Sequence, residues 1–192
     1  MIFRIKHHWG ATLAVTMAGA LLGYLLGGWD QLRVPHVSVA QQLALGVAGT
    51  LAALLTNLAL HTILQWSLRD RYLAAFERYG NVVLDNMRWP HYLAGGLMAA
   101  VAEEPLFRGV LVATIDQPIA GIVVAAVAFA LCHWLRKEFW PFWFWAIWEG
   151  VLFGILFVAT GSLLVPMIAH GLHDVLAYRV FQSLLPEIRR QR

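Results

Sequence analysis

The sequence predicts an all-α fold: a polytopic membrane helical bundle of about six transmembrane helices, with an amphipathic helix at the membrane interface. Two observations support this prediction. The 192 residues are 60% hydrophobic and 13% charged, with a mean hydropathy of +0.65, whereas soluble domains carry about 25% charged residues. Apolar runs close to the roughly 20 residues that cross about 30 Å of hydrocarbon also recur along the whole chain.

Six apolar segments are long enough, or nearly so, to span a bilayer. They cover residues 10–28, 42–66, 92–115, 118–135, 141–160 and 162–182. The first is too long for a signal-peptide core and lacks a small-residue cleavage site after it, so we expect a retained helix. Tryptophans at segment ends, such as Trp66 and Trp140, are typical of the headgroup level. No internal repeat or low-complexity linker is visible, so one integral-membrane domain is expected over residues 1–192.

The connection at residues 67–91 has a different pattern. It mixes charged side chains such as Arg71 with apolar ones such as Phe76. This pattern predicts an amphipathic helix at the cytoplasmic interface, broken near Gly80.

The basic residues predict the orientation, because loops rich in lysine and arginine face the cytoplasm. Only Arg33 would lie outside. The positions predicted inside are Arg4, Lys6, Arg69, Arg71, Arg78, Arg88, Arg136, Lys137, Arg189, Arg190 and Arg192. Both termini are therefore expected in the cytoplasm. The formal net charge of +3 does not indicate nucleic-acid binding, since the basic residues lie between apolar segments and not on one soluble face.

Three ionisable residues interrupt the third apolar segment: Glu103, Glu104 and Arg108. Each costs about 2.5–3.5 kcal/mol at membrane depth, so a use for them is expected. Glu104 and Arg108 are four residues apart, share a helix face and can pair. Glu103 points about 100° away and faces other helices. Pro105 has no N–H group, so the helix is expected to be weakened or kinked beside the carboxylates.

Two other segments carry polar side chains at the same depth. His133 lies at the end of the fourth, and His170 and Asp174 share one face of the sixth. Such groups are tolerated in a membrane only if they converge and satisfy one another. Either Glu103 acts as a general base on a water beside His133, with His170 and Asp174 on the carbonyl side, or the histidines and a glutamate bind zinc. Both chemistries hydrolyse amides.

Further polar residues lie outside these groups. Glu149, in the fifth segment, is expected either to line the cavity or to pair with Arg179 or a histidine. Asn57 and His61 are four residues apart in the second segment and are expected to form hydrogen bonds between helices.

Three motifs resemble those of the CPBP family, the CAAX-protease and bacteriocin-processing enzymes also called Abi proteins. The stretch 102–109, Ala-Glu-Glu-Pro-Leu-Phe-Arg-Gly, resembles the family's E-E-x-x-x-R motif. Phe129 to His133 is similar to its F-x-x-x-H motif. His170 with Asp174 resembles its H-x-x-x-N/D motif, including the small-residue turn and proline upstream.

The resemblance implies a role for each matching residue, with a catalytic core at about residues 92–182. Glu103 would be the catalytic carboxylate and His133 its partner on the water, while Glu104 and Arg108 would support them. His170 and position 174 would form the oxyanion side. Asp174 departs from the asparagine of many relatives, because an ionised carboxylate cannot donate a hydrogen bond to an oxyanion.

The resemblance also implies the activity. It predicts a glutamic-type intramembrane endopeptidase without a required cofactor, acting on a membrane-tethered protein or peptide in a bacterial plasma membrane. The alternatives are a zinc-dependent protease with Glu103, His133 and His170 as ligands, and a non-catalytic bacteriocin-immunity or partner-binding protein of the same fold. A small transporter is disfavoured because the two halves show no matching repeats.

Overall fold

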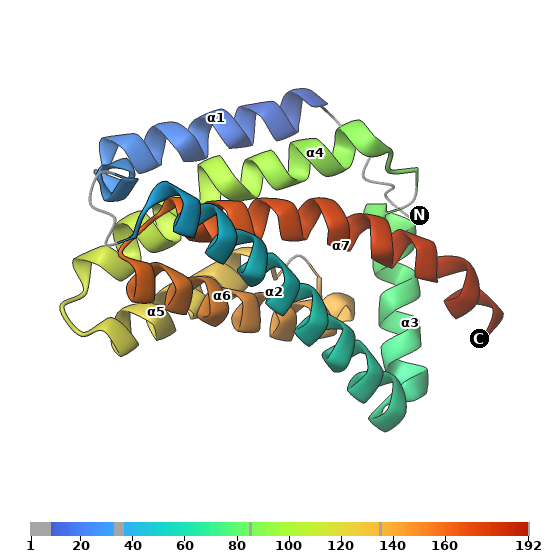
Figure 1. The fold of residues 1–192 in the computed structure, drawn as a ribbon. Helices are drawn as coiled ribbons and strands as arrows, with labels where there is room; N and C mark the ends of the chain where they lie inside the picture. Colours follow the sequence, from blue (N-terminus) through green and yellow to red (C-terminus); the bar gives the residue numbers. More distant parts are fainter. Residues whose placement is uncertain (1–8, 33–36, 85, 135, 192) are drawn as a thin grey trace.

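The computed structural model describes residues 9–32, 37–84, 86–134 and 136–191 (Figure 1). All regular secondary structure in these ranges is helical, as predicted. The α-helices are α1 (Trp9–Leu25), α2 (Val39–Ser67), α3 (Arg69–Tyr79), α4 (Trp89–Met98), α5 (Pro118–Cys132), α6 (Trp140–Thr160) and α7 (Leu164–Arg190). The other helical turns are η1 (Gly28–Leu32), η2 (Gly80–Leu84), η3 (Ala99–Glu103), η4 (Pro105–Val112) and η5 (Lys137–Phe139).

Two helices of the described chain are long and apolar enough to cross a membrane by length and composition, Val39–Ser67 and Lys137–Thr160. The apolar helices Leu13–Leu25 and Pro118–Cys132 are shorter. The helix ends follow local sequence. Ser38 and Gln41 form a capping box that starts α2, satisfying backbone N–H groups that the first turn leaves free. Gly161 ends α6 in the left-handed conformation, with φ of +59°, which glycine adopts without strain.

Helix α7 lies at the centre of the bundle and packs against α2, α4 and α6. Figure 1 shows α1 running alongside α4, with α5 and α6 paired on the other side of α7. Small residues permit the close crossing of α4 and α7, since a Cβ on Gly96 would lie 2.4 Å from the carbonyl oxygen of Gly171.

The amphipathic helix expected over residues 67–91 forms as α3 and gives way to the π-helical turn η2 at Gly80. Its apolar face is covered by protein. Tyr72 and Phe76 are fully buried, and their rings pack edge-to-face on Trp145 of α6, with Phe76 also against Phe181 of α7. In Figure 1, α3 crosses the ends of α2 and α7. Helix α3 therefore closes one end of the bundle, and its apolar face rests on protein.

The third expected segment is a helix that begins at Trp89 and contains the two π-helical stretches η3 and η4. At their junction the N–H of Glu104 bonds to the carbonyl oxygen of Ala99, five residues back. The weakening expected beside Pro105 thus takes the form of wide π turns, a feature often found at functional sites.

Some predictions fall on residues outside the described ranges. These include the orientation residues Arg4, Lys6, Arg33 and Arg192.

The fourth segment was expected to reach residue 135, but α5 ends at Cys132. His133 is therefore the residue that terminates the helix, not part of its interior.

Candidate active site

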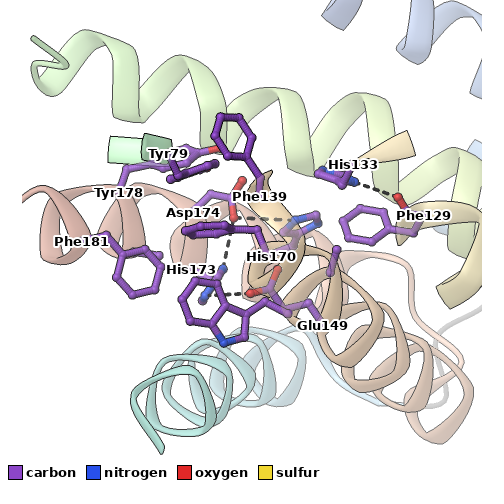
Figure 2. A pocket seen from close by; sticks show the side chains of 14 residues that line it. Tyr79, Phe129, His133, Phe139, Glu149, His170, His173, Asp174, Tyr178 and Phe181 are labelled. Carbon is purple, nitrogen blue, oxygen red and sulfur yellow. Dashed lines mark hydrogen bonds and ion pairs between the residues drawn. The ribbon is translucent and has the colours of Figure 1, made fainter. Parts of the chain in front are cut away.

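A cavity of about 110 Å³ lies between α5, α6 and α7, with Tyr79 at the end of α3 on its wall. Figure 2 shows the side chains that line it, with a polar group facing an aromatic group. The polar group consists of His133, Glu149, His170, His173 and Asp174. Such a volume is enough for several water molecules, since a cavity needs roughly 10–15 Å³ to hold one.

A buried ion pair lies behind the polar group. Glu104 and Arg108 are both fully buried, and Arg108 donates to Glu104 Oε1 over 2.8 Å. The predicted pairing of these two residues is confirmed. Arg108 also donates to the carbonyl oxygen of Gly150 over 3.2 Å. The rings of Phe129 and Phe153 lie 5.1 and 5.5 Å from its guanidinium carbon, within the range of cation–π attraction.

Glu104 has a second partner that the sequence did not indicate. His170 Nδ1 lies 2.7 Å from the same Oε1 atom of Glu104. An ionised carboxylate can only accept, so His170 Nδ1 carries a proton and donates a hydrogen bond to Glu104. Nε2 of His170 then faces the cavity. It has no hydrogen-bond partner among the described residues, and the nearest carboxylate oxygens belong to Asp174 at 3.7 Å and Glu103 at 4.0 Å.

Glu103 keeps more freedom than its neighbour. Its side chain is 17% exposed, against 0% for Glu104, and its closest described ionic contact is the 4.0 Å approach to His170 Nε2. No hydrogen bond or ion pair joins Glu103 to His133 within the described part of the chain. The structure thus brings Glu103, His170 and Asp174 together and leaves His133 beyond direct contact with Glu103.

His133 lies at the exposed edge of the cavity, directly after α5. Its Nδ1 is 2.8 Å from the carbonyl oxygen of Phe129, and the two rings are 4.3 Å apart. A carbonyl oxygen only accepts, so Nδ1 carries a proton and a neutral His133 has its lone pair on Nε2. That arrangement suits a residue that receives a hydrogen bond from water.

Glu149 both lines the cavity and pairs with a histidine, so the two expected arrangements occur together. Its Oε1 accepts a hydrogen bond from Asn57 Nδ2 over 2.6 Å and lies 3.5 Å from His173 Nε2. His173 Nδ1 is 3.1 Å from Asp174 Oδ1. Arg179 is exposed and forms no ion pair with Glu149. The expected interhelical role of Asn57 is confirmed.

An aromatic wall, which the sequence analysis did not predict, faces these polar residues. Tyr79 of α3, Phe139 of η5 and Phe181 of α7 line the cavity. Tyr79 stacks on Phe142 with ring centroids 3.8 Å apart. Burial raises the pKa of Tyr79, and the charges of Asp174 and Glu149 raise it further. Tyr79 therefore remains a neutral phenol that can donate a hydrogen bond.

The described residues place one candidate ligand set for a metal ion within reach of a common point. Glu149, His170 and Asp174 offer ligand atoms that all lie within 4.8 Å of one another. This set differs from the zinc ligands expected in the alternative mechanism, Glu103, His133 and His170.

Residues 85–176 match the family described as Rce1-like, type II CAAX prenyl endopeptidase. The chain is therefore similar to that family over a little less than half of its length. The match confirms the resemblance drawn from the three motifs, all of which lie inside the matched range.

Another relative of the chain is the uncharacterized protein YpbD of Bacillus subtilis (strain 168), with 36% identity over 85 residues. The aligned part covers 44% of this chain and 42% of the relative, so the chain spans less than half the length of the curated relative it matches. No solved structure matches. The Rce1-like match over residues 85–176 includes all five polar residues that line the cavity.

Proposed function

We propose that this Rce1-like protein is an intramembrane endopeptidase that hydrolyses a peptide bond of a membrane-tethered protein or peptide in a bacterial plasma membrane. The observation that supports it most is the gathering of Glu103, His170 and Asp174 beside a cavity that His133 borders at its exposed edge. These residues come from three helices, in an arrangement that helix packing alone does not require.

The surface supports a bilayer location. Only 28% of the apolar window of α2, and 33% of the window in the helix ending at Thr160, is buried inside the protein. Core helices of soluble proteins bury most of their apolar surface. Leu13, Leu55 and Ile119, on three different helices, are each more than half exposed, and extended apolar surface of this kind marks contact with lipid or protein. We propose six membrane-crossing segments, with both termini in the cytoplasm.

In the proposed reaction, Glu103 is the general base. A water between Glu103 and His133 Nε2 loses a proton to the Glu103 carboxylate as its oxygen attacks the carbonyl carbon of the substrate. The tetrahedral intermediate then breaks its C–N bond, and the protonated Glu103 returns the proton to the leaving amine. The absence of a direct Glu103–His133 contact leaves room for this water.

The carbonyl oxygen of the substrate belongs on the opposite side, near His170 and Asp174. Charge that develops on this oxygen needs positive groups or hydrogen-bond donors that are fixed in advance. Glu104 fixes the His170 ring through Nδ1, with Arg108 holding Glu104 in turn. Glu104 and Arg108 therefore position His170 and make no contact with the reacting atoms.

The activity can be tested without a known substrate. Membrane proteomes from a strain that lacks the gene, complemented with wild type, Glu103→Gln or His133→Ala, would be compared for proteins that accumulate uncleaved. The same uncleaved proteins should accumulate with both variants and disappear with wild type. Glu187→Gln, a charge-matched change at an exposed residue of α7, should behave as wild type.

The main rival is a non-catalytic binding protein of the same fold. If the uncleaved proteins disappear with both variants as completely as with wild type, Glu103 and His133 are not catalytic. The binding role then stands. A prenylated peptide with a CAAX ending, incubated with purified protein in lipid nanodiscs, tests the substrate class suggested by the family's description. Mass spectrometry would detect the two product fragments.

A further inference from the structure

Two adjacent pockets, of about 320 and 260 Å³, lie between α3 and the turn η5, apart from the active-site cavity. They share Arg78 and Glu138. Arg136 and Phe139 line the first pocket, and Arg71 and Trp140 line the second. In Figure 1, α3 lies across one end of the bundle. The pockets therefore open at that end, with walls that combine arginines and aromatic rings.

Positive charge exceeds negative charge in these pockets. Among the described residues, the ionisable groups that line them are three arginines and one carboxylate, namely Arg71, Arg78, Arg136 and Glu138. The three arginines are exposed, and within the described part of the chain no hydrogen bond or ion pair holds them. Asp70 and Glu77, the acidic residues of α3, line neither pocket. The arginines are thus available to an anion from outside the protein.

Helix α3 presents two of these arginines on a single face. Arg71, Ala74, Ala75 and Arg78 follow the spacing of three and four residues that places side chains on one side of a helix, and all four line the second pocket. The small alanine side chains leave the hollow between the two guanidinium groups. The apolar face of α3 already packs on α6 and α7, so these arginines are not needed to hold α3 on a lipid surface.

We propose that the two pockets bind the phosphate headgroup of one anionic phospholipid from the cytoplasmic leaflet, with Arg78 at the centre and Arg71 and Arg136 on either side. A guanidinium group matches phosphate oxygens with paired N–H donors. Trp140 lies near the start of the apolar span Lys137–Thr160, and tryptophan is typical of the headgroup level. The pockets therefore lie at the depth of a lipid phosphate. This inference rests on the proposed bilayer location and orientation, and not on the proposed peptidase activity.

The headgroup site adjoins the wall of the active-site cavity. Phe139 lines both the first pocket and that cavity. Tyr79 directly follows Arg78 and packs edge-to-face on Phe139, with ring centroids 5.4 Å apart. A phosphate held between Arg78 and Arg136 therefore restrains η5 against α3, and with it this part of the cavity wall. Bound anionic lipid is expected to raise the melting temperature for that reason.

The test uses the full chain purified in detergent, with phosphatidylglycerol and the zwitterionic phosphatidylcholine as probes. Native mass spectrometry counts bound lipids, and a titration gives the apparent affinity for each. Wild type should bind one phosphatidylglycerol at least tenfold more tightly than phosphatidylcholine, and its melting temperature should rise with phosphatidylglycerol alone. Arg78→Gln and Arg136→Gln should each weaken this binding about fivefold, because one arginine near a membrane surface contributes about 1 kcal/mol.

Arg69→Gln is the matched control. It removes the same charge from an exposed residue of α3 that lines neither pocket, so it should bind phosphatidylglycerol as wild type does. Inorganic phosphate at millimolar concentration distinguishes a lipid from a free anion, and it should leave phosphatidylglycerol bound. Melting curves without added lipid establish that the variants are folded.

Three results would overturn the site. One is equal affinity of wild type for the two lipids. Another is wild-type affinity in both Arg78→Gln and Arg136→Gln, or an equal loss in Arg69→Gln, which would reduce the effect to general surface charge. The third is full displacement by inorganic phosphate, which would assign the pockets to a soluble anion. If phosphatidylglycerol binding fails while Glu103→Gln still abolishes cleavage, this inference falls and the proposed peptidase stands.

Discussion

Substituting Glu103 and Glu104 one at a time tests whether two adjacent carboxylates have separate roles. Glu104 is fully buried, with Arg108 at 2.8 Å and His170 at 2.7 Å. Removing one member of a buried ion pair costs about 3–5 kcal/mol. Since each kcal/mol shifts the melting temperature of a chain of this size by about 2–4 °C, Glu104→Gln should lower it by roughly 6–20 °C.

Glu103→Gln should have the opposite profile. The Glu103 side chain is partly exposed and its closest ionic partner is 4.0 Å away, so the isosteric amide should cost about 1 kcal/mol or less, the typical effect of a single substitution. Loss of a general base lowers the rate by about 10²–10⁴-fold. The variant should therefore be folded and nearly inactive.

Both variants would be purified in the same detergent beside wild type. Tryptophan fluorescence on heating gives the melting temperature, and cleavage of a substrate found by the proteome comparison gives the rate. The reasoning is refuted if Glu104→Gln melts as wild type while Glu103→Gln melts more than 6 °C lower and remains active. That outcome would show that Glu103, and not Glu104, is the buried ion-pair residue.

Three further changes test other parts of the structure. Gly109→Ala should prevent stable folding, because its Cβ would lie 2.2 Å from the backbone oxygen of Gly28; the yield of monodisperse protein measures this. Tyr72→Phe should cost about 1–3 kcal/mol, read as a lower melting temperature, because buried His61 loses its hydroxyl partner. Ala177→Phe should fill the cavity that Ala177 lines and reduce cleavage at least tenfold; retention of full activity would place the reaction elsewhere.

Local geometry explains which contacts could be predicted. The Glu104–Arg108 pair follows from the spacing of four residues on one helix, and the end of α3 follows from Gly80. The bond from Glu104 to His170 joins positions 66 residues apart, and the one from Asn57 to Glu149 joins positions 92 apart. Such contacts depend on how the helices cross, which hydropathy and spacing do not specify.

The position of α3 is a second feature that hydropathy and spacing do not specify. An amphipathic pattern states that one face is covered, and it is satisfied equally by lipid and by protein. The aromatic rings of Tyr72 and Phe76 resolve the choice, since they pack on Trp145 and, for Phe76, on Phe181. The consequence for the site is direct, because this packing carries Tyr79 to the cavity wall.

The π turns connect the motif's sequence to its geometry. In a regular α-helix, adjacent side chains diverge by about 100°, which predicts that Glu103 and Glu104 serve different partners. Both carboxylates instead approach the same imidazole, Glu104 at Nδ1 and Glu103 nearer Nε2. The i→i+5 bonding around Glu104 places more residues in each turn, so successive side chains diverge less. His170 can then be oriented by Glu104 through Nδ1 while its Nε2 lies 4.0 Å from Glu103, which makes the wide turn itself a part of the site.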